Sequence, residues 1–298
     1  RASIIFKGKF VGDNVKKFVS LSKMMKTGEF GGQVGGKKVN LGNLFEADFD
    51  HSIKLYLNSD KTKKGKYPNE VAKLIQLVGG GVVDSEQVGG SNLKRTLVLR
   101  GSDVVLKAEK STPQISMNIG ETVSDVTLKC ANNKEIYLSL KHGNSVTWMN
   151  SGIQRTFKQT DFIKNFDGYN DRLGLAILKM FGIDPKLFAQ TFNDYGKSGH
   201  KMDHVTVSSS GWQKSKVQNL LKYAIGYNYL MIHGGISGGI KMFAVDEKYM
   251  KQAANITDST IKILYGGKSG KGKRIDIEMQ SSKYVFKWNI RNKQGGKY

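Results

Sequence analysis

The sequence is poor in cysteine, proline and acidic residues, and each shortage excludes a class of protein. The single cysteine, Cys130, excludes an intrachain disulfide and a cysteine-rich zinc site. The three prolines exclude a proline-rich polymer. No apolar run reaches the roughly 18 residues of a membrane-spanning helix, so we expect no membrane partner. With no signal-peptide pattern at residues 1–6, the lone cysteine favours the cytoplasm.

The shortage of acids leaves a large positive charge. There are 47 Lys and Arg residues against 25 Asp and Glu residues, a net charge of +22 at pH 7. An excess of this size indicates a polyanionic partner, and nucleic acid is the commonest one. The charge leaves open whether this nucleic acid is DNA or RNA, and the sequence leaves open whether the chain forms a homodimer.

Hydrophobic patterning predicts an α/β fold with a central mixed sheet flanked by helices. We expect a single elaborated domain over residues 1–298, with a core at about 65–245 and a basic, β-rich extension at about 246–298. The expected helices cover residues 14–25, 68–78, 171–181, 185–195, 212–232 and 247–254. The expected strands cover residues 96–99, 104–107, 114–119, 123–128, 135–141, 145–149, 240–245, 260–264, 274–280 and 284–290.

The most informative segment, residues 120–154, contains a predicted hairpin. Asp125 lies in its first strand, and Ser139 and Lys141 lie at the end of its second. Antiparallel strands joined by a short turn bring Asp125 and Lys141 together at one end of a sheet. Carboxylates hold Mg²⁺, which lowers the pKa of bound water and polarises a phosphoryl group, while a lysine stabilises developing negative charge. These are residue types that phosphodiester hydrolysis requires.

A strand aspartate, a hairpin and then (D/E)-x-K in the second strand is the pattern of the PD-(D/E)XK nucleases, and the segment from Asp125 to Lys141 resembles it. The polar run at 142–154 and the lysine-rich, cysteine-poor composition resemble phage proteins of this restriction endonuclease-like type. The resemblance implies a restriction endonuclease-like core and an Mg²⁺-dependent or Mn²⁺-dependent endonuclease that cleaves double-stranded DNA. It further implies Asp125 as metal ligand, Lys141 as catalytic lysine, and a host-cytoplasmic or virion location.

The chain departs from the pattern at Ser139, where the family has Asp or Glu. A neutral hydroxyl is a weak Mg²⁺ ligand, so the predicted site lacks one carboxylate. Some family members use a glutamate from the preceding helix, and Glu70 in the helix predicted at 68–78 fits that role as a metal ligand. Glu121 and Glu135 fit it less well.

Each of these residues also has a purely structural interpretation. Asp125 and Lys141 are compatible with an ordinary strand end, and Glu70 with a favourable acid in the first turn of a helix. A chain that kept the fold but lost the acid would be a non-catalytic DNA-binding or virion protein. An RNA-binding or RNA-processing protein is a further alternative. A second carboxylate close to Asp125 would favour the enzyme.

Two basic segments suggest contacts with DNA. Residues 89–95 combine glycines with Asn92, Lys94 and Arg95, which suit phosphates or base edges, although a solvated turn has the same composition. The segment 262–298 has ten Lys and Arg residues against two acids. Basic, aromatic and amide groups interleave in it, as nucleic-acid contacts require. The remaining candidates are Gln154, Lys287, Arg291, Lys293 and Gln294.

Overall fold

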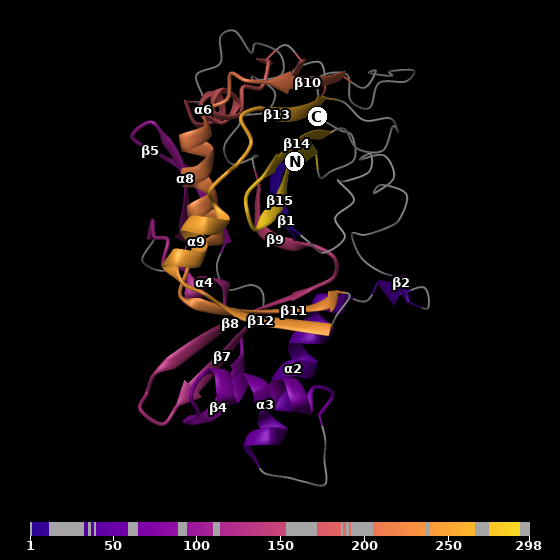
Figure 1. The fold of residues 1–298 in the computed structure, drawn as a ribbon, viewed down its shortest axis with the longest axis vertical. Coiled ribbons are helices and arrows are strands. Elements are labelled where there is room, and N and C mark those ends of the chain that lie inside the picture. Colours follow the sequence, from indigo (N-terminus) through magenta and orange to yellow (C-terminus); the bar gives the residue numbers. More distant parts are fainter. Residues whose placement is uncertain are drawn as a thin grey trace.

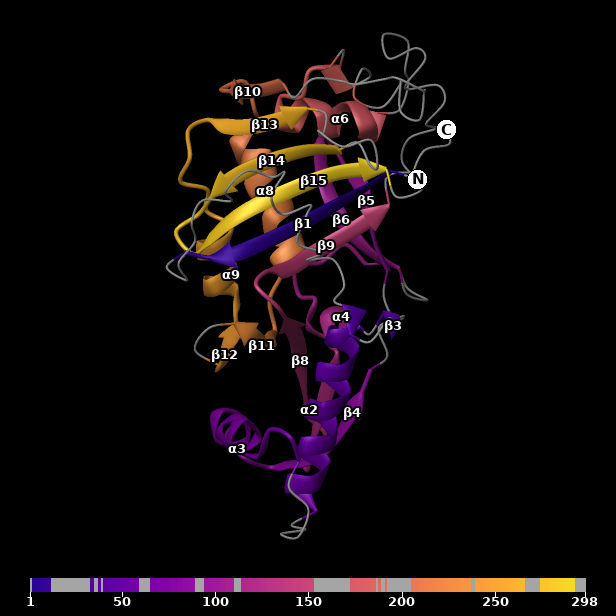
Figure 2. The same ribbon diagram turned by 90° about the vertical axis from the view of Figure 1, so that its right-hand side faces the viewer.

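Two β-sheets form the framework of the fold, and helices pack on both (Figures 1 and 2). The computed structural model describes residues 2–11, 33–34, 37–38, 40–58, 65–88, 94–109, 114–152, 172–185, 187–188, 191, 205–236, 239–265 and 274–292. The fold is mixed α/β, as the sequence predicts. No helix within these ranges is long and apolar enough to cross a membrane.

The larger sheet has six strands, and every neighbouring pair in it is antiparallel. Its order is β10 (Val205–Ser209), β13 (Ile261–Tyr265), β14 (Arg274–Gln280), β15 (Tyr284–Asn292), β1 (Ala2–Phe10) and β9 (Val146–Gly152). The strands predicted at 274–280 and 284–290 are confirmed as β14 and β15. The basic C-terminal segment thus shares one sheet with the first strand of the chain.

The smaller sheet has five strands and is mixed. Its order is β12 (Gly239–Val245), β11 (Tyr229–Ile236), β8 (Glu135–His142), β7 (Val126–Cys130) and β4 (Val82–Gln87). Strands β8 and β11 are parallel, and the other three neighbouring pairs are antiparallel. The predicted hairpin is confirmed as β7 and β8. Asn133 in its turn has φ of 62°, a conformation that asparagine adopts more readily than most residues.

The helices divide between the two sheets (Figure 2). Helices α2 (Leu41–Leu57) and α3 (Pro68–Leu77) lie beside the five-stranded sheet, whereas α6 (Arg172–Phe181) and α8 (Lys214–Ile225) lie behind the six-stranded sheet. The shorter elements are α4 (Gly120–Val123), α9 (Glu247–Ala253), and the two-stranded pairs β2 (Gln33–Val34) with β3 (Lys37–Lys38) and β5 (Lys94–Arg100) with β6 (Asp103–Glu109).

The apolar core divides into two clusters, and the larger one includes Tyr229, Met231 and Val245 of the five-stranded sheet as well as the six-stranded sheet. In the larger core, Trp288 stacks on Phe6 with ring centroids 4.3 Å apart and meets Phe181 of α6 edge-on at 5.0 Å. The smaller core joins α2 and α3 to one face of the five-stranded sheet through Phe45, Phe49, Ile53, Val71, Leu74, Val126, Leu128, Leu138, Leu140 and Ile232. Burial of each large apolar side chain contributes about 1.5–3 kcal/mol, so these contacts fix α2 and α3 on the sheet.

Helix α2 is absent from the sequence-based prediction, yet its residues explain it. Asn40 caps the helix, because its side-chain oxygen accepts hydrogen bonds from backbone N–H groups of the first turn. Phe45, Phe49 and Ile53 follow at intervals of four residues and are all buried. This spacing places them on one face, which packs on the sheet.

The helix predicted at 212–232 is wrong beyond Ile225, where α8 ends. Gly226 has φ of 58°, and a Cβ atom there would lie 2.2 Å from the Ile119 side chain, so glycine both ends the helix and allows close packing. The residues that follow form β11, which is parallel to β8. Strands of parallel pairs carry continuous apolar runs, which periodicity alone does not separate from a helix.

Other predicted elements differ less. The strand predicted at 114–119 is wrong, because only isolated bridges at Gln114 and Asn118 occur there. Strands β1 and β4 were not predicted. The helix predicted at 14–25, and most of the one predicted at 185–195, lie outside the described residues.

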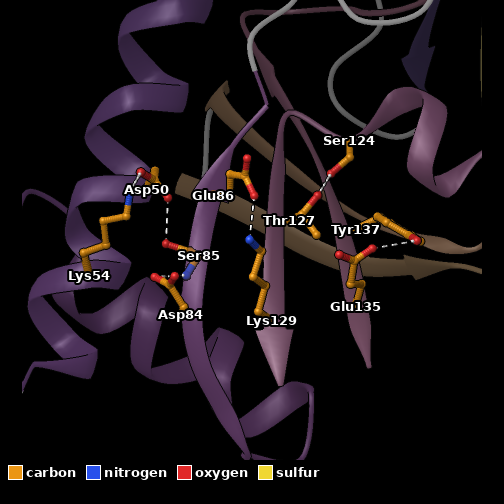
Figure 3. A network of polar contacts seen from close by, with 10 residues as sticks. All are labelled: Asp50, Lys54, Asp84, Ser85, Glu86, Ser124, Thr127, Lys129, Glu135 and Tyr137. Carbon is orange, nitrogen blue, oxygen red and sulfur yellow. Dashed lines mark hydrogen bonds and ion pairs between the residues drawn. The ribbon is translucent and has the colours of Figure 1, made fainter. Parts of the chain in front are cut away.

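A buried polar contact fastens α2 to β4 (Figure 3). Ser85 of β4 donates its hydroxyl hydrogen to Asp50 Oδ1 at 2.6 Å, and Lys54 Nζ donates to Asp50 Oδ2 at 2.8 Å. Asp50 is 6% exposed and Ser85 is 2% exposed. A carboxylate at this depth is tolerated because both of its oxygens have donors. The contact therefore fixes the position of α2 along the sheet.

Replacement of Ser85 by alanine tests this contact. Ser85→Ala leaves Asp50 Oδ1 buried without its donor, so we expect the free energy of unfolding to fall by about 1–3 kcal/mol. Denaturant unfolding measures the change. Ser282→Ala, in the exposed turn before β15, is the matched control and should change stability by less than about 0.5 kcal/mol. Equal losses in the two variants would show that the Ser85 hydroxyl does not hold α2.

Candidate active site

The residues of the predicted hairpin motif meet at the end of β8. Asp125 Oδ2 accepts a hydrogen bond from the backbone N–H of Leu140 at 2.7 Å. The same oxygen is 3.4 Å from Lys141 Nζ and 3.4 Å from the Ser139 hydroxyl, both of which donate to it. The side chains of Asp125 and Lys141 remain 18% and 25% exposed. The aspartate and the lysine are therefore adjacent, as predicted, and reachable from solvent.

Backbone contacts from two strands hold Asp125 in place. Its N–H donates to Leu138 O of β8 at 2.8 Å, and its carbonyl accepts from Val88 N, just beyond β4, at 2.9 Å. The short helix α4 ends at Val123, with Ser124 as its C-cap. Asp125 thus lies immediately before β7, and its side chain turns to the end of β8.

Ser139 supports Asp125 instead of supplying a ligand. It is 1% exposed, and its hydroxyl points to Asp125 Oδ2. Because that oxygen already takes three donors, the oxygen open to a further ligand is Oδ1, which accepts no hydrogen bond from the described residues.

A second carboxylate, Glu46, comes from α2 and was missed in the sequence. The pKa of Glu46 is raised to about 7: burial raises it most, the negative charge of Asp125 raises it as well, and the positive charge of Lys141 lowers it. Glu46 is half-buried and accepts no hydrogen bond from the described residues. The three charges therefore belong to one electrostatic cluster. The Asn40 cap and the four-residue spacing of Phe45 and Phe49 are the sequence signals that could have located this helix.

The glutamates proposed from the sequence do not join this cluster. Glu70 lies in the first turn of α3, without an ion pair or hydrogen bond to Asp125 or Lys141. Glu121 is exposed on α4. Glu135 is exposed at the opposite end of β8 and accepts a hydrogen bond from the Tyr137 hydroxyl at 3.2 Å. Glu70 as metal ligand therefore stays a prediction, and Glu46 is the carboxylate that interacts electrostatically with Asp125 and Lys141.

Arg95 does not fit the predicted DNA contact. Its guanidinium donates to Tyr223 O and Ala224 O at 3.2 and 3.1 Å and to Trp148 O at 2.5 Å. The first two carbonyls belong to the last turn of α8, where such groups lack helical donors and attract positive charge. Desolvation lowers the pKa of Arg95 to about 10. Arg95 is thus a structural residue that joins β5 to α8 and β9.

Lys287 likewise has a structural setting. It is 7% exposed and lies directly opposite Glu278 in the pairing of β14 with β15. Burial raises the pKa of Glu278, and the charge of Lys287 lowers it. A lysine covered in this way does not fit the predicted contact with phosphate.

The remaining predicted DNA contacts are not placed. The backbones of Lys94 and Arg291 lie in β5 and β15, but their side chains fall outside the described part of the chain. Asn92, Gln154, Lys293 and Gln294 lie outside the described residues altogether.

No ready-made metal centre of three or more His, Cys, Asp or Glu side chains occurs among the described residues. Comparison of the chain with protein-family models, curated proteins and solved structures finds no match. The cluster of Glu46, Asp125 and Lys141 must therefore be interpreted from its own chemistry.

The raised pKa of Glu46 makes stability depend on pH. Its pKa is about 7 in the folded state against 4.5 ordinarily, so the folded state holds this proton more tightly. The stabilisation that comes from this tighter proton binding is complete below pH 4.5 and is lost as the pH rises through about 7. Glu46→Gln stays neutral throughout, so relative to wild type we expect it to gain about 1–2 kcal/mol between pH 5 and pH 8, after allowance for partial exposure.

Denaturant unfolding of both proteins at the two pH values measures this difference. Other titrating groups, such as Glu278, are common to both proteins and cancel. A difference in unfolding free energy that does not change with pH would contradict the assigned environment of Glu46.

Proposed function

We propose that the chain is an Mg²⁺-dependent endonuclease that hydrolyses phosphodiester bonds in double-stranded DNA, with Glu46, Asp125 and Lys141 as its reacting residues. The observation that carries the proposal is the electrostatic coupling of two carboxylates, from separate elements, with one lysine at the solvent-reachable end of β8. A structural role alone gives no reason to place Glu46 where burial and Asp125 both oppose its charge.

The order of elements supports the resemblance to the PD-(D/E)XK nucleases. That family is expected to run helix, three strands, helix, strand. In this chain α2 and α3 precede β4, β7 and β8 of one sheet, with β5, β6 and α4 inserted between β4 and β7. After β8 come β9, α6 and β10, and then α8, which precedes β11 of the same sheet. The candidate lysine lies at the end of β8, next to the parallel strand β11.

The two carboxylates suit a divalent cation of the Mg²⁺ type. Such ions take oxygen ligands and are held by one or two protein carboxylates together with substrate phosphate. Asp125 Oδ1 and the Glu46 carboxylate are the atoms that would hold Mg²⁺ or Mn²⁺. Bound there, the cation would neutralise the repulsion between these acids, supply a water of lowered pKa and polarise the phosphoryl group.

The protein's own groups have distinct roles in this proposal. Lys141, held beside Asp125, stabilises negative charge that develops on the phosphate. Leu140 N–H and the Ser139 hydroxyl orient Asp125, which leaves its Oδ1 directed to the ligand. Glu46, coupled electrostatically to Asp125, would supply the second carboxylate to the cation. The net charge of +22 supplies long-range attraction to the DNA phosphates.

A non-catalytic DNA-binding protein with a degenerate nuclease fold is the second candidate. Ser139 favours it, because a buried hydroxyl stands where the family pattern has an acid. The large positive charge is equally compatible with this candidate and with RNA as the polyanion.

Nicking of supercoiled plasmid in Mg²⁺, beside an EDTA control, tests the enzyme. We expect Glu46→Gln, Asp125→Asn and Lys141→Ala each to lower the initial rate by at least about 100-fold. The double variant of Asp125 and Lys141 should be little worse than either single variant, because residues that act together are not additive. Glu70→Gln, the same change on the neighbouring helix, is the matched control and should keep the wild-type rate.

Affinity for DNA in EDTA should remain near wild type in all of these variants. Wild-type protein that binds DNA but does not cleave it in Mg²⁺ or Mn²⁺ would favour the non-catalytic candidate. A loss of activity in Glu70→Gln with full activity in Glu46→Gln would refute the assignment of the second carboxylate.

A further inference from the structure

Aromatic rings and lysines alternate where the two sheets meet. The strip consists of Phe10 at the end of β1, Lys241 and Phe243 of β12, Tyr249 of α9, and Lys283 in the turn before β15. We call these five residues the aromatic–lysine strip. All five are partly exposed. Figure 2 shows the end of β1, α9 and β12 on the same side of the molecule.

The rings of the strip contact one another, and the lysines lie over ring faces. Phe243 is 5.7 Å from Phe10 and 5.2 Å from Tyr249 between ring centroids. Lys241 Nζ lies 4.9 Å from the centre of the Phe10 ring, and Lys283 Nζ lies 4.8 Å from that of Tyr249. The nearest acids on α9, Asp246 and Glu247, have partners in the helix: Asp246 caps it, and Glu247 pairs with Lys251.

The strip starts close to the candidate active site. Lys141 of β8 is paired with His233 of β11, which is paired with Lys241 of β12. Directly paired residues project on the same face of a sheet, and two strand spacings amount to about 10 Å. The Phe10 ring lies 6.0 Å from the His233 ring. Lys141 and Lys241 therefore lie on the same face of the sheet, with the buried His233 between them.

Partly exposed rings that alternate with ammonium groups suit a single nucleic-acid strand. Each base of an unpaired strand has a free face for stacking, and its phosphates follow at regular intervals. In a duplex the base faces are covered by their neighbours, so rings gain little from it, whereas lysines contact both forms through phosphate.

We propose that the aromatic–lysine strip binds an unpaired strand that continues from the nucleic acid held at the candidate active site. The preferred substrate is then a duplex with a single-stranded extension. The statement that this strand continues from the candidate active site rests on the proposed function. Binding of the strand by the strip does not require cleavage. Continuous duplex as the ligand, and a purely structural seam between the sheets, are the competing outcomes.

Fluorescence anisotropy in EDTA tests the strip without any cleavage. The probes are labelled oligothymidine, oligouridine, a blunt DNA duplex, and the same duplex with a single-stranded tail. The variants are Lys241→Gln/Lys283→Gln, which removes two charges, and Phe243→Leu, which removes one ring. Their controls are Lys73→Gln/Lys134→Gln, at exposed positions of α3 and of the turn between β7 and β8, and Tyr56→Leu at an exposed position of α2.

We expect the strip lysine variant to weaken binding of the single strands and the tailed duplex by about tenfold and to reduce the salt slope by about one. Phe243→Leu should weaken the same probes by about fivefold with an unchanged salt slope, because stacking is lost and charge is kept. On the blunt duplex, Phe243→Leu should change the affinity by less than about twofold, and the lysine variant should lose less than it does on the tailed duplex. Both controls should change by less than about twofold on every probe.

Equal losses on blunt duplex and single strands would overturn the preference for an unpaired strand. Unchanged affinities in both strip variants, each with wild-type thermal unfolding, would leave the strip as a structural seam. Oligothymidine and oligouridine distinguish DNA from RNA as the source of the strand. Because EDTA prevents metal-dependent cleavage, a protein without nuclease activity gives the same binding result, and the two proposals fail separately.

Discussion

The packing of α2 on the five-stranded sheet is the contact on which the candidate site depends. Glu46 belongs to this helix, whereas Asp125 and Lys141 belong to a hairpin far along the chain. Apolar contacts press the helix to the sheet, but they permit sliding. The buried bond between Asp50 and Ser85 specifies one position, and Asp50 lies one helical turn beyond Glu46. Displacement by a single turn would move Glu46 by about 5.4 Å and separate the carboxylates.

The charge of Glu46 is poorly compensated, in contrast to the charges of Asp50 and Arg95. Asp50 has a donor on each oxygen, and Arg95 satisfies three backbone carbonyls. Burial and the negative charge of Asp125 disfavour the ionised form of Glu46, and the charge of Lys141 favours it. Proteins tolerate such local cost at sites that act on a ligand, because a bound cation or phosphate partner reverses it. This uncompensated charge of Glu46, more than the hairpin motif, distinguishes this end of β8 from the rest of the sheet.

The sequence predicts local features well and distant ones poorly. The hairpin was predictable because a short Asn-Asn turn joins two adjacent strands, and that alone brings Asp125 to Lys141. Glu46 was not, because its position depends on tertiary packing and its helix follows a glycine-rich stretch that hid the signal. Arg95 was misassigned because sequence does not distinguish a solvated arginine from one that binds helix carbonyls. The extent of α8 was overestimated because the apolar run of β11 follows it.

The position of β1 has a consequence for folding. This strand lies between β9 and β15. Strand β9 is synthesised midway along the chain, whereas β15 is the final strand described. During synthesis from the N-terminus, all strands of the five-stranded sheet have emerged once β12 is complete, whereas β1 must wait for β15. Pairing over so long a separation is slow, because the loop entropy is lost before the contacts form. We therefore expect the nascent chain to carry an assembled smaller sheet beside an unfinished larger one, with an open edge on β1 that a chaperone is suited to shield.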